Sequence, residues 1–205
     1  MRAHSRRGGA ELRLRRPSPG STMWRMSTAP VTDLSYPIGK FKYAGPSDEA
    51  QRRHHIDEIA AVPERARKAV HGLSDAQLDT PYRPGGWKVR QVIHHLADSH
   101  MNAYIRCKLA FTEEVPTVKP YDEKLWADLA DMQLPIEISL VLLESLHKRW
   151  VTFLCFLKPA DFERKFNHPE SGATTLDKAV AHYAWHGQHH IAHINKLRER
   201  MGWKA

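Results

Sequence analysis

Four long segments of this 205-residue chain carry the apolar spacing of an α-helix, and they constrain the fold more than any other feature. The spacing predicts helices over roughly 48–72, 88–114, 136–158 and 175–201, each bounded by glycine or proline. Alternating strand patterns are scarce, so at most a short hairpin fits between the helices. We therefore expect an all-α protein, a single-domain four-helix bundle.

Local signals add detail to this outline. Pro63 lies inside the first predicted helix, where it either starts a new helical stretch or kinks the helix. Thr174 and Asp177 resemble a capping box at the start of the last helix. Cys107 and Cys155 lie in helical, apolar contexts, which indicates reduced core residues and no disulfide framework.

The net charge of +8 comes mostly from the first 26 residues, which hold seven arginines and one acid. Only +2 remains for the rest of the chain, too little for the basic surface that binds nucleic acid. No apolar run approaches the roughly 18 residues that a membrane span needs. We expect a cytoplasmic protein with no nucleic-acid and no membrane partner.

The composition of the N-terminal leader offers no apolar pattern for a core and no continuous apolar region of a secretory signal. We expect residues 1–32 to be a disordered basic leader and residues 33–205 to be the folded domain. Met23 and Met26 favour a mis-assigned start codon as the source of the leader. An organellar transit peptide is the alternative interpretation.

Histidines concentrate in the last predicted helix, where HYAWHGQHHIAHI, residues 182–194, holds five of the chain's 14. At about 100° per residue, His190 lies within the apolar stripe and His186 lies at its edge. His182, His189 and His193 point further toward solvent. Two inward imidazoles spaced i, i+4 can converge on one metal ion. Other pairs share this spacing, 182/186 and 189/193, but burial favours 186/190.

The second predicted helix has a polar stripe beside its apolar arc, made of Gln91, His95, Asp98, Ser99, Asn102 and Arg106. The stripe is either a solvated face or the lining of a pocket to which its histidine contributes a metal ligand. In the second case Asp98 is a candidate base or orienting group. Asn102 and Arg106 are then candidates for binding an anionic substrate. His94 and His100 are interpreted as core histidines.

Several blocks of the sequence closely resemble the YfiT-type branch of the DinB-like superfamily, which includes bacillithiol transferases and proteins described as metal-dependent hydrolases. The blocks are PGGWKVRQVIHHLADSHMNAYIRCKLAFTE, VPTVKPYDEKLW, NHPESG and YAWHGQHHIAHI, in the family's order over residues 33–203. The resemblance implies an up-down-down-up four-helix bundle, commonly dimeric, with one divalent metal on three histidines. The matching positions are His95, before the LAD block, and His186 and His190 in WHGQHH.

Three neutral imidazoles leave one position of a tetrahedral zinc ion open, which is the pattern of catalytic sites. Such a site activates a bound water or a bound thiol near neutral pH. We expect one divalent ion per chain, zinc before nickel, in a homodimer. The expected function is a metal-dependent hydrolase or a bacillithiol-like thiol S-transferase, with the thiol as the favoured nucleophile. A non-catalytic metal-binding dimeric module is the alternative.

A chain that begins at Met26 is expected to keep the melting temperature and the metal content of the full chain. The residues it lacks offer no apolar pattern that packs on a core. Calorimetry and metal analysis of the two proteins check this. A melting temperature lowered by several degrees would mean that the leader packs on the bundle.

Overall fold

The computed structural model describes residues 33–204, so the expected leader, residues 1–32, lies outside the described part. The predicted four-helix bundle is confirmed, and each long helix begins and ends within two residues of its predicted bounds. These helices are α1 (Glu49–Val70), α3 (Val89–Thr112), α5 (Ile136–Phe156) and α6 (Leu176–Met201). Within the described residues, no helix combines the length and the apolar character needed to cross a membrane.

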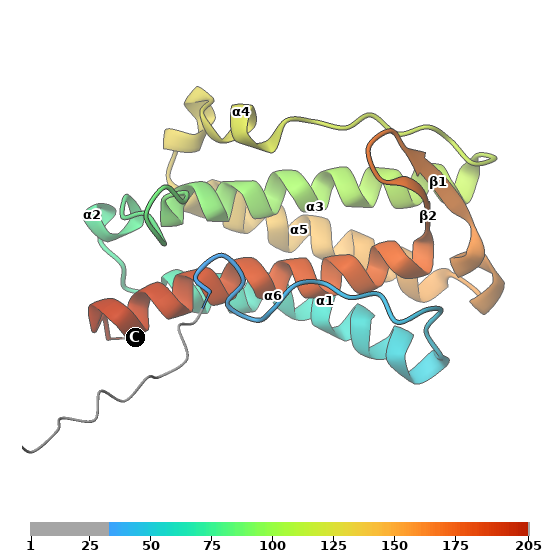
Figure 1. Cartoon of the computed structure of the whole chain (residues 1–205), viewed down its shortest axis with the longest axis horizontal. Coiled ribbons are helices and arrows are strands. Elements are labelled where there is room, and N and C mark those ends of the chain that lie inside the picture. Colours follow the sequence, from blue (N-terminus) through green and yellow to red (C-terminus); the bar gives the residue numbers. More distant parts are fainter. Residues whose placement is uncertain (1–32, 205) are drawn as a thin grey trace, which may run out of the picture. The chain divides into compact units, whose positions relative to one another are not determined.

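The helices run up-down-down-up: α1 and α6 point one way, and α3 and α5 point the other (Figure 1). Both α5 and α6 pack against α1 and against α3, so α1 and α3 are diagonal in the bundle. Parallel neighbours α3 and α5 need a long connection, and residues 113–135 return along α3 to supply it (Figure 1). This topology sends a long loop over one face of the bundle.

Short elements fill the connections between the long helices. The expected short hairpin is present, and it pairs Lys165 with Thr175 in antiparallel register at the end of the bundle where α3 ends (Figure 1). The short elements are α2 (Asp75–Leu78), α4 (Glu123–Ala127), two 3₁₀ turns (Ala130–Gln133 and Pro159–Glu163), β1 (Lys165–His168) and β2 (Gly172–Thr175).

Helix α1 is continuous through Pro63, which does not start a new helix. Proline has no N–H, so the carbonyl of Ile59, four residues earlier, lacks its usual helical donor. That carbonyl instead accepts a hydrogen bond from Nδ1 of His147 on α5, at 2.7 Å. The proline therefore leaves a backbone acceptor facing the interior of the bundle.

The predicted capping box at Thr174 and Asp177 is wrong by one residue. Strand β2 extends through Thr175, and the hydroxyl of Thr175 caps α6 by accepting from the N–H of Lys178 at 3.1 Å. Asp177 is buried instead and accepts from the backbone N–H of Ser47 at 2.9 Å. It therefore fastens the segment that precedes α1 to the start of α6.

The two cysteines differ in burial. Cys107 is buried as expected, and burial raises the pKa of its thiol to about 12, which keeps the thiol protonated. The expectation that Cys155 is also in the core is wrong, because Leu154 takes the inward position on α5 and leaves Cys155 exposed. Both thiols are free, in agreement with the absence of a disulfide framework in the sequence.

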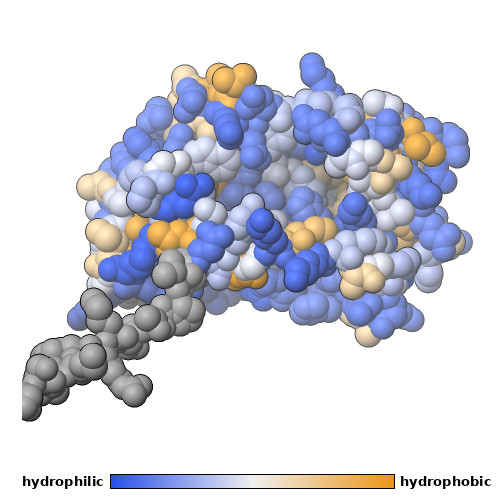
Figure 2. All heavy atoms as spheres, in the orientation of Figure 1, coloured by the Kyte–Doolittle hydropathy of each residue, from blue (hydrophilic) through white to orange (hydrophobic). Residues whose placement is uncertain are grey.

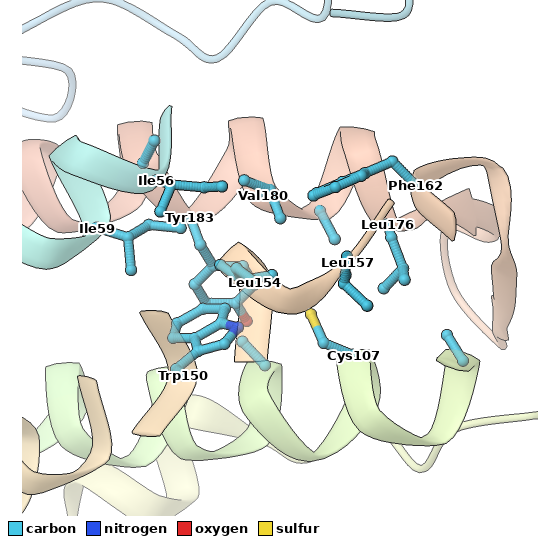
Figure 3. Packing of buried hydrophobic residues seen from close by; sticks show 14 of the residues in the cluster. Ile56, Ile59, Cys107, Trp150, Leu154, Leu157, Phe162, Leu176, Val180 and Tyr183 are labelled. Carbon is cyan, nitrogen blue, oxygen red and sulfur yellow. The ribbon is translucent and has the colours of Figure 1, made fainter. Parts of the chain in front are cut away.

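The buried apolar side chains form two clusters, one toward each end of the bundle. In the first, shown in Figure 3, Trp150 packs edge-on against Tyr183 with ring centroids 5.6 Å apart. The second consists mainly of Val62, Ala66, Val89, Val92, Ile93, Leu96, Leu140, Leu143, Ile191, Ile194 and Leu197. Between the clusters, α3, α5 and α6 contribute the buried histidines His100, His147 and His186. The middle of the core is therefore polar.

Gly187 on α6 faces Val62 on α1, and a Cβ at this position would clash with the Val62 side chain. We expect Gly187→Ala to destabilise the metal-free protein by about 1–3 kcal/mol, because Val62 is fully buried and stiff. Urea unfolding measures this change. In a Val62→Ala background the same substitution should be neutral or should stabilise by up to about 1 kcal/mol, through helix propensity. Equal losses in both backgrounds would contradict the steric explanation.

Candidate metal centre

The structure brings the three predicted ligand residues together. One ring nitrogen of each of His95, His186 and His190 lies within 4.8 Å of the corresponding atoms of the other two. The ring centroids of His186 and His190 are 4.5 Å apart, and that of His95 is 4.7 Å from His190. The i, i+4 pair on α6 therefore meets a histidine of the neighbouring helix α3, the arrangement that the sequence predicts.

The three histidines are buried. His95 is only 3% exposed and lies under the indole of Trp87, with ring centroids 4.6 Å apart. Burial lowers the pKa of His95 to about 4. The pKa values of His186 and His190 are well below the ordinary value because of burial first and of the neighbouring imidazoles second. All three rings are therefore neutral at pH 7, the form that offers a lone pair to a metal.

Two of these rings carry nitrogens that lack any partner in the described part of the chain. They are Nε2 of His95 and Nδ1 of His190, and both are buried. A buried polar atom without a hydrogen bond costs about 1–3 kcal/mol. A cation held among the rings would remove such a cost, and neutral imidazole is a ligand that suits zinc, nickel, copper and iron. The residues present thus fit a divalent transition metal.

A cavity of about 1430 Å³ opens beside the histidines, and His186 and His190 form part of its lining. Figure 2 shows the face of the molecule on which the surface is hollowed. Other residues of α3 and α6 also line it, together with segments far apart in the sequence, within 35–41, 82–87, 120–128 and 166–174. The candidate metal centre is therefore open to small molecules from one side and closed by the bundle on the other.

The remaining predicted site residues divide into two groups. Ser99 and Arg106 line the cavity, and the Arg106 guanidinium donates to a backbone carbonyl of the crossover loop at 3.0 Å. Asp98 and Asn102 do not line it, and the Asn102 amide donates to the Asp98 carbonyl within α3 at 2.9 Å. Burial, with a smaller contribution from Asp131, raises the pKa of Asp98 to about 6. Helical periodicity placed all four on one stripe, but only Ser99 and Arg106 face the cavity.

The prediction that His189 and His193 face solvent is wrong, because they are 7% and 3% exposed. Non-helical segments cover them: the ring of Tyr36 lies 5.9 Å from His189, and Tyr82 stacks on His193 at 4.0 Å. The Nε2 atoms of the two histidines lie within 3.1 Å and share a hydrogen bond. His182, on the same side of α6, is half-buried and lines the cavity. A helical wheel does not reveal cover from outside the bundle.

Sequence reasoning assigned no role at the site to three residues around the candidate ligands, although it placed one of them, His100, in the core, where it is fully buried. Trp87 covers His95, and His100 and His147 form a chain of hydrogen bonds that leads away from His186. His147 had a usable signal, since a histidine in the strongly apolar segment 136–158 needs partners inside the core. No sequence signal pointed to Trp87, because it lies in a loop whose position depends on the tertiary fold.

Comparison with known proteins agrees with this geometry. The family model described as the DinB superfamily matches residues 58–194. The chain belongs to the DinB superfamily. A relative from Bacillus mycoides (strain KBAB4), named "Putative metal-dependent hydrolase", is 58% identical over 173 residues, which are 84% of this chain and 100% of the relative. A relative of the same name from Bacillus cereus (strain 03BB102) is 56% identical over the same shares.

A solved structure has the same fold. It is described as "YfiT from Bacillus subtilis is a probable metal-dependent hydrolase with an unusual four-helix bundle topology". It superposes with a TM-score of 0.81 at 50% identity, covering 83% of this chain and 99% of that chain. The resemblance to the YfiT-type branch and the up-down-down-up bundle are thereby confirmed.

The metal-free protein is expected to lose stability as the pH falls from about 6.5 to about 4. Burial lowers the pKa of His147 to about 4 and that of His193 to about 3, whereas an unfolded histidine has a pKa near 6.5. Below pH 6.5 the unfolded chain binds more protons, so acid favours unfolding. For His147 the full loss is on the order of 3 kcal/mol. Urea midpoints between pH 7 and pH 4 measure the slope, and a flat profile would contradict this account.

Proposed function

We propose that this chain is a metal-dependent hydrolase in which His95, His186 and His190 hold one divalent cation, zinc in the first place. The observation that carries the proposal is the meeting of three neutral, buried imidazoles, with nitrogens within 4.8 Å, beside a cavity of about 1430 Å³. Three protein ligands leave a coordination position for a reacting group, whereas structural zinc sites use four. The names of the relatives support the same reaction class.

A divalent cation with an open position supplies Lewis acidity and lowers the pKa of a coordinated nucleophile. The residues of the chain prepare the place for it. His186 and His190 present their rings to the cavity, while His95 and Trp87 close its inner side. Arg106 brings a guanidinium to the wall, where it can bind a carboxylate or a phosphate of the substrate. The site is therefore suited to a polar or anionic hydrolysable molecule.

Thiol S-transfer is the second candidate, and the size of the cavity favours it. A volume of about 1430 Å³ exceeds the roughly 300–1,000 Å³ of ordinary ligand pockets, so a thiol and an electrophile fit together. Thiolate is also a soft ligand that zinc accepts readily. A bacillithiol-like thiol and an alkylating electrophile are the proposed reactants in this case.

The expected homodimer also stays a proposal, and an apolar outer face of α5 supports it. Ile138, Val141 and Leu142 are neighbours on this face and are 53%, 50% and 42% exposed, although all three are apolar. Exposed apolar patches of this kind commonly mark interfaces between subunits. The cytoplasmic location stays a prediction from the sequence.

Alanine at His95, His186 or His190 is expected to abolish retention of the metal, because two remaining ligands bind far more weakly than three. Metal analysis after gel filtration measures the metal content per folded chain. His189→Ala and His193→Ala serve as matched controls, since these buried histidines share the i, i+4 spacing on α6 and bond to each other but do not belong to the group of converging ring nitrogens. Loss of metal in the controls with retention in the three variants would overturn the assignment.

Turnover distinguishes the remaining functions. Metal-loaded protein is supplied with ester and amide substrates, and separately with low-molecular-weight thiols plus monochlorobimane. Hydrolysis that disappears in His190→Ala supports the hydrolase, and metal-dependent thioether formation supports the S-transferase. If neither reaction occurs at full metal occupancy, the non-catalytic metal-binding module becomes the better description.

A further inference from the structure

We propose that His100 and His147 are positioning residues that determine which ring nitrogen of His186 carries the proton. They do so through a row of three hydrogen bonds that all point in the same direction and end at the Ile59 carbonyl. The row lies outside the three candidate ligands and links α6 to α3, α5 and α1 in turn. The proposal rests on the proposed metal site, because it concerns which nitrogen of His186 is free to bind the ion.

Three contacts make up the row. Nδ1 of His186 lies 3.2 Å from Nε2 of His100, and Nδ1 of His100 lies 2.9 Å from Nε2 of His147. Nδ1 of His147 lies 2.7 Å from the carbonyl oxygen of Ile59. Each contact has the heavy-atom separation of a hydrogen bond. Every ring nitrogen of the row is thereby engaged except Nε2 of His186.

The carbonyl at the end sets the direction of every bond. A carbonyl oxygen only accepts, so Nδ1 of His147 must donate to Ile59. A neutral imidazole has one donor and one acceptor, so Nε2 of His147 accepts from Nδ1 of His100. By the same rule, Nε2 of His100 accepts from Nδ1 of His186. The remaining nitrogen, Nε2 of His186, then carries a lone pair, as a metal ligand requires.

Burial keeps this pattern unique. His100 is fully buried and His147 is 2% exposed, so neither water nor an added charge is readily accommodated along the row. The rings are also held in place, because Trp150 and Tyr183 meet His100 edge-on at centroid distances of 5.8 and 5.3 Å. Figure 3 shows Trp150 and Tyr183 next to Ile59 in the first apolar cluster.

Pro63 explains why the Ile59 carbonyl is available. In an uninterrupted helix this oxygen would accept from the N–H of residue 63, which proline lacks. A proline inside a helix normally destabilises or kinks it, yet α1 continues through Pro63. The freed carbonyl is the acceptor on which the directions of all three bonds depend. The helix defect and the candidate metal ligand are thus connected across four helices.

Without this row of hydrogen bonds, His186 would have no preferred tautomer. If the proton were on Nε2, the His186 ring would direct an N–H group at the metal position and could not bind the metal through that nitrogen. Groups that hydrogen-bond to a metal-bound histidine commonly contribute about 10–100-fold to metal affinity. A loss of this size is expected when His147 can no longer accept from His100.

The tautomers are tested first in the wild-type, metal-free chain. Two-dimensional ¹⁵N–¹H NMR of the imidazoles is expected to show the proton on Nδ1 in His186, His100 and His147. A proton on Nε2 of any of the three would overturn the proposal. This readout needs neither metal nor substrate.

Metal affinity is tested with two substitutions at one position. His147→Phe keeps the approximate volume but removes the acceptor, so zinc affinity measured by chelator competition should fall about 10–100-fold. His147→Gln should restore most of it, because the amide oxygen can accept from His100 while the amide nitrogen donates to Ile59. The rescue distinguishes a directed hydrogen bond from general packing.

His94→Phe is the matched control. His94 is buried on α3 and pairs with the Ser139 hydroxyl at 2.7 Å and the Leu134 carbonyl at 3.1 Å, with no bond to the candidate ligands. The His94→Phe substitution should lower the free energy of unfolding without a comparable change in zinc affinity. If His147→Phe keeps the zinc affinity of the wild type while His95→Ala loses the metal, the proposed role of the hydrogen-bond row is overturned and the proposed metal site is not. Metal retention in His95→Ala would instead overturn the proposed metal site.

Discussion

The burial of several neutral imidazoles in the middle of the bundle is the constraint on which the rest of the structure depends. A buried imidazole must stay uncharged and must find a partner for each nitrogen, or the fold loses free energy. His147 and His100 meet this requirement through each other, His186 and the Ile59 carbonyl. Among residues 33–204, His95 and His190 each keep one buried ring nitrogen without a protein partner. The proposed metal would supply a ligand partner at the place where the three rings converge.

The two apolar clusters make this polar layer tolerable. They lie on either side of it, so the helices are held together at both ends while the middle carries the polar groups. The layer in turn holds the helices in register, because a hydrogen bond such as that of His147 to Ile59 is lost when helices slide. Stability and the geometry of the candidate centre thus depend on the same side chains.

The up-down-down-up topology gives the centre its opening. Parallel α3 and α5 require a long crossover, and that loop forms one wall of the cavity while the segment before α1 forms another. Loops of this kind vary more readily than the helices that carry the histidines. The same metal ligands can therefore serve hydrolysis or thiol transfer, with the reactants selected by the loop residues around the cavity.

The sequence by itself determined the four helices and their ends, because helical periodicity is a local property. It also singled out His186 and His190, but the burial on which that choice rested does not separate them from His189 and His193, which are at least as buried. Its resemblance to a family supplied His95. Only the tertiary structure decided that His189 and His193 are buried, that Asp98 lies off the cavity, and that one histidine chain ends at a carbonyl left free in α1. These features depend on contacts between segments far apart in the chain, and the spacing of residues along one helix carries no record of what packs against it.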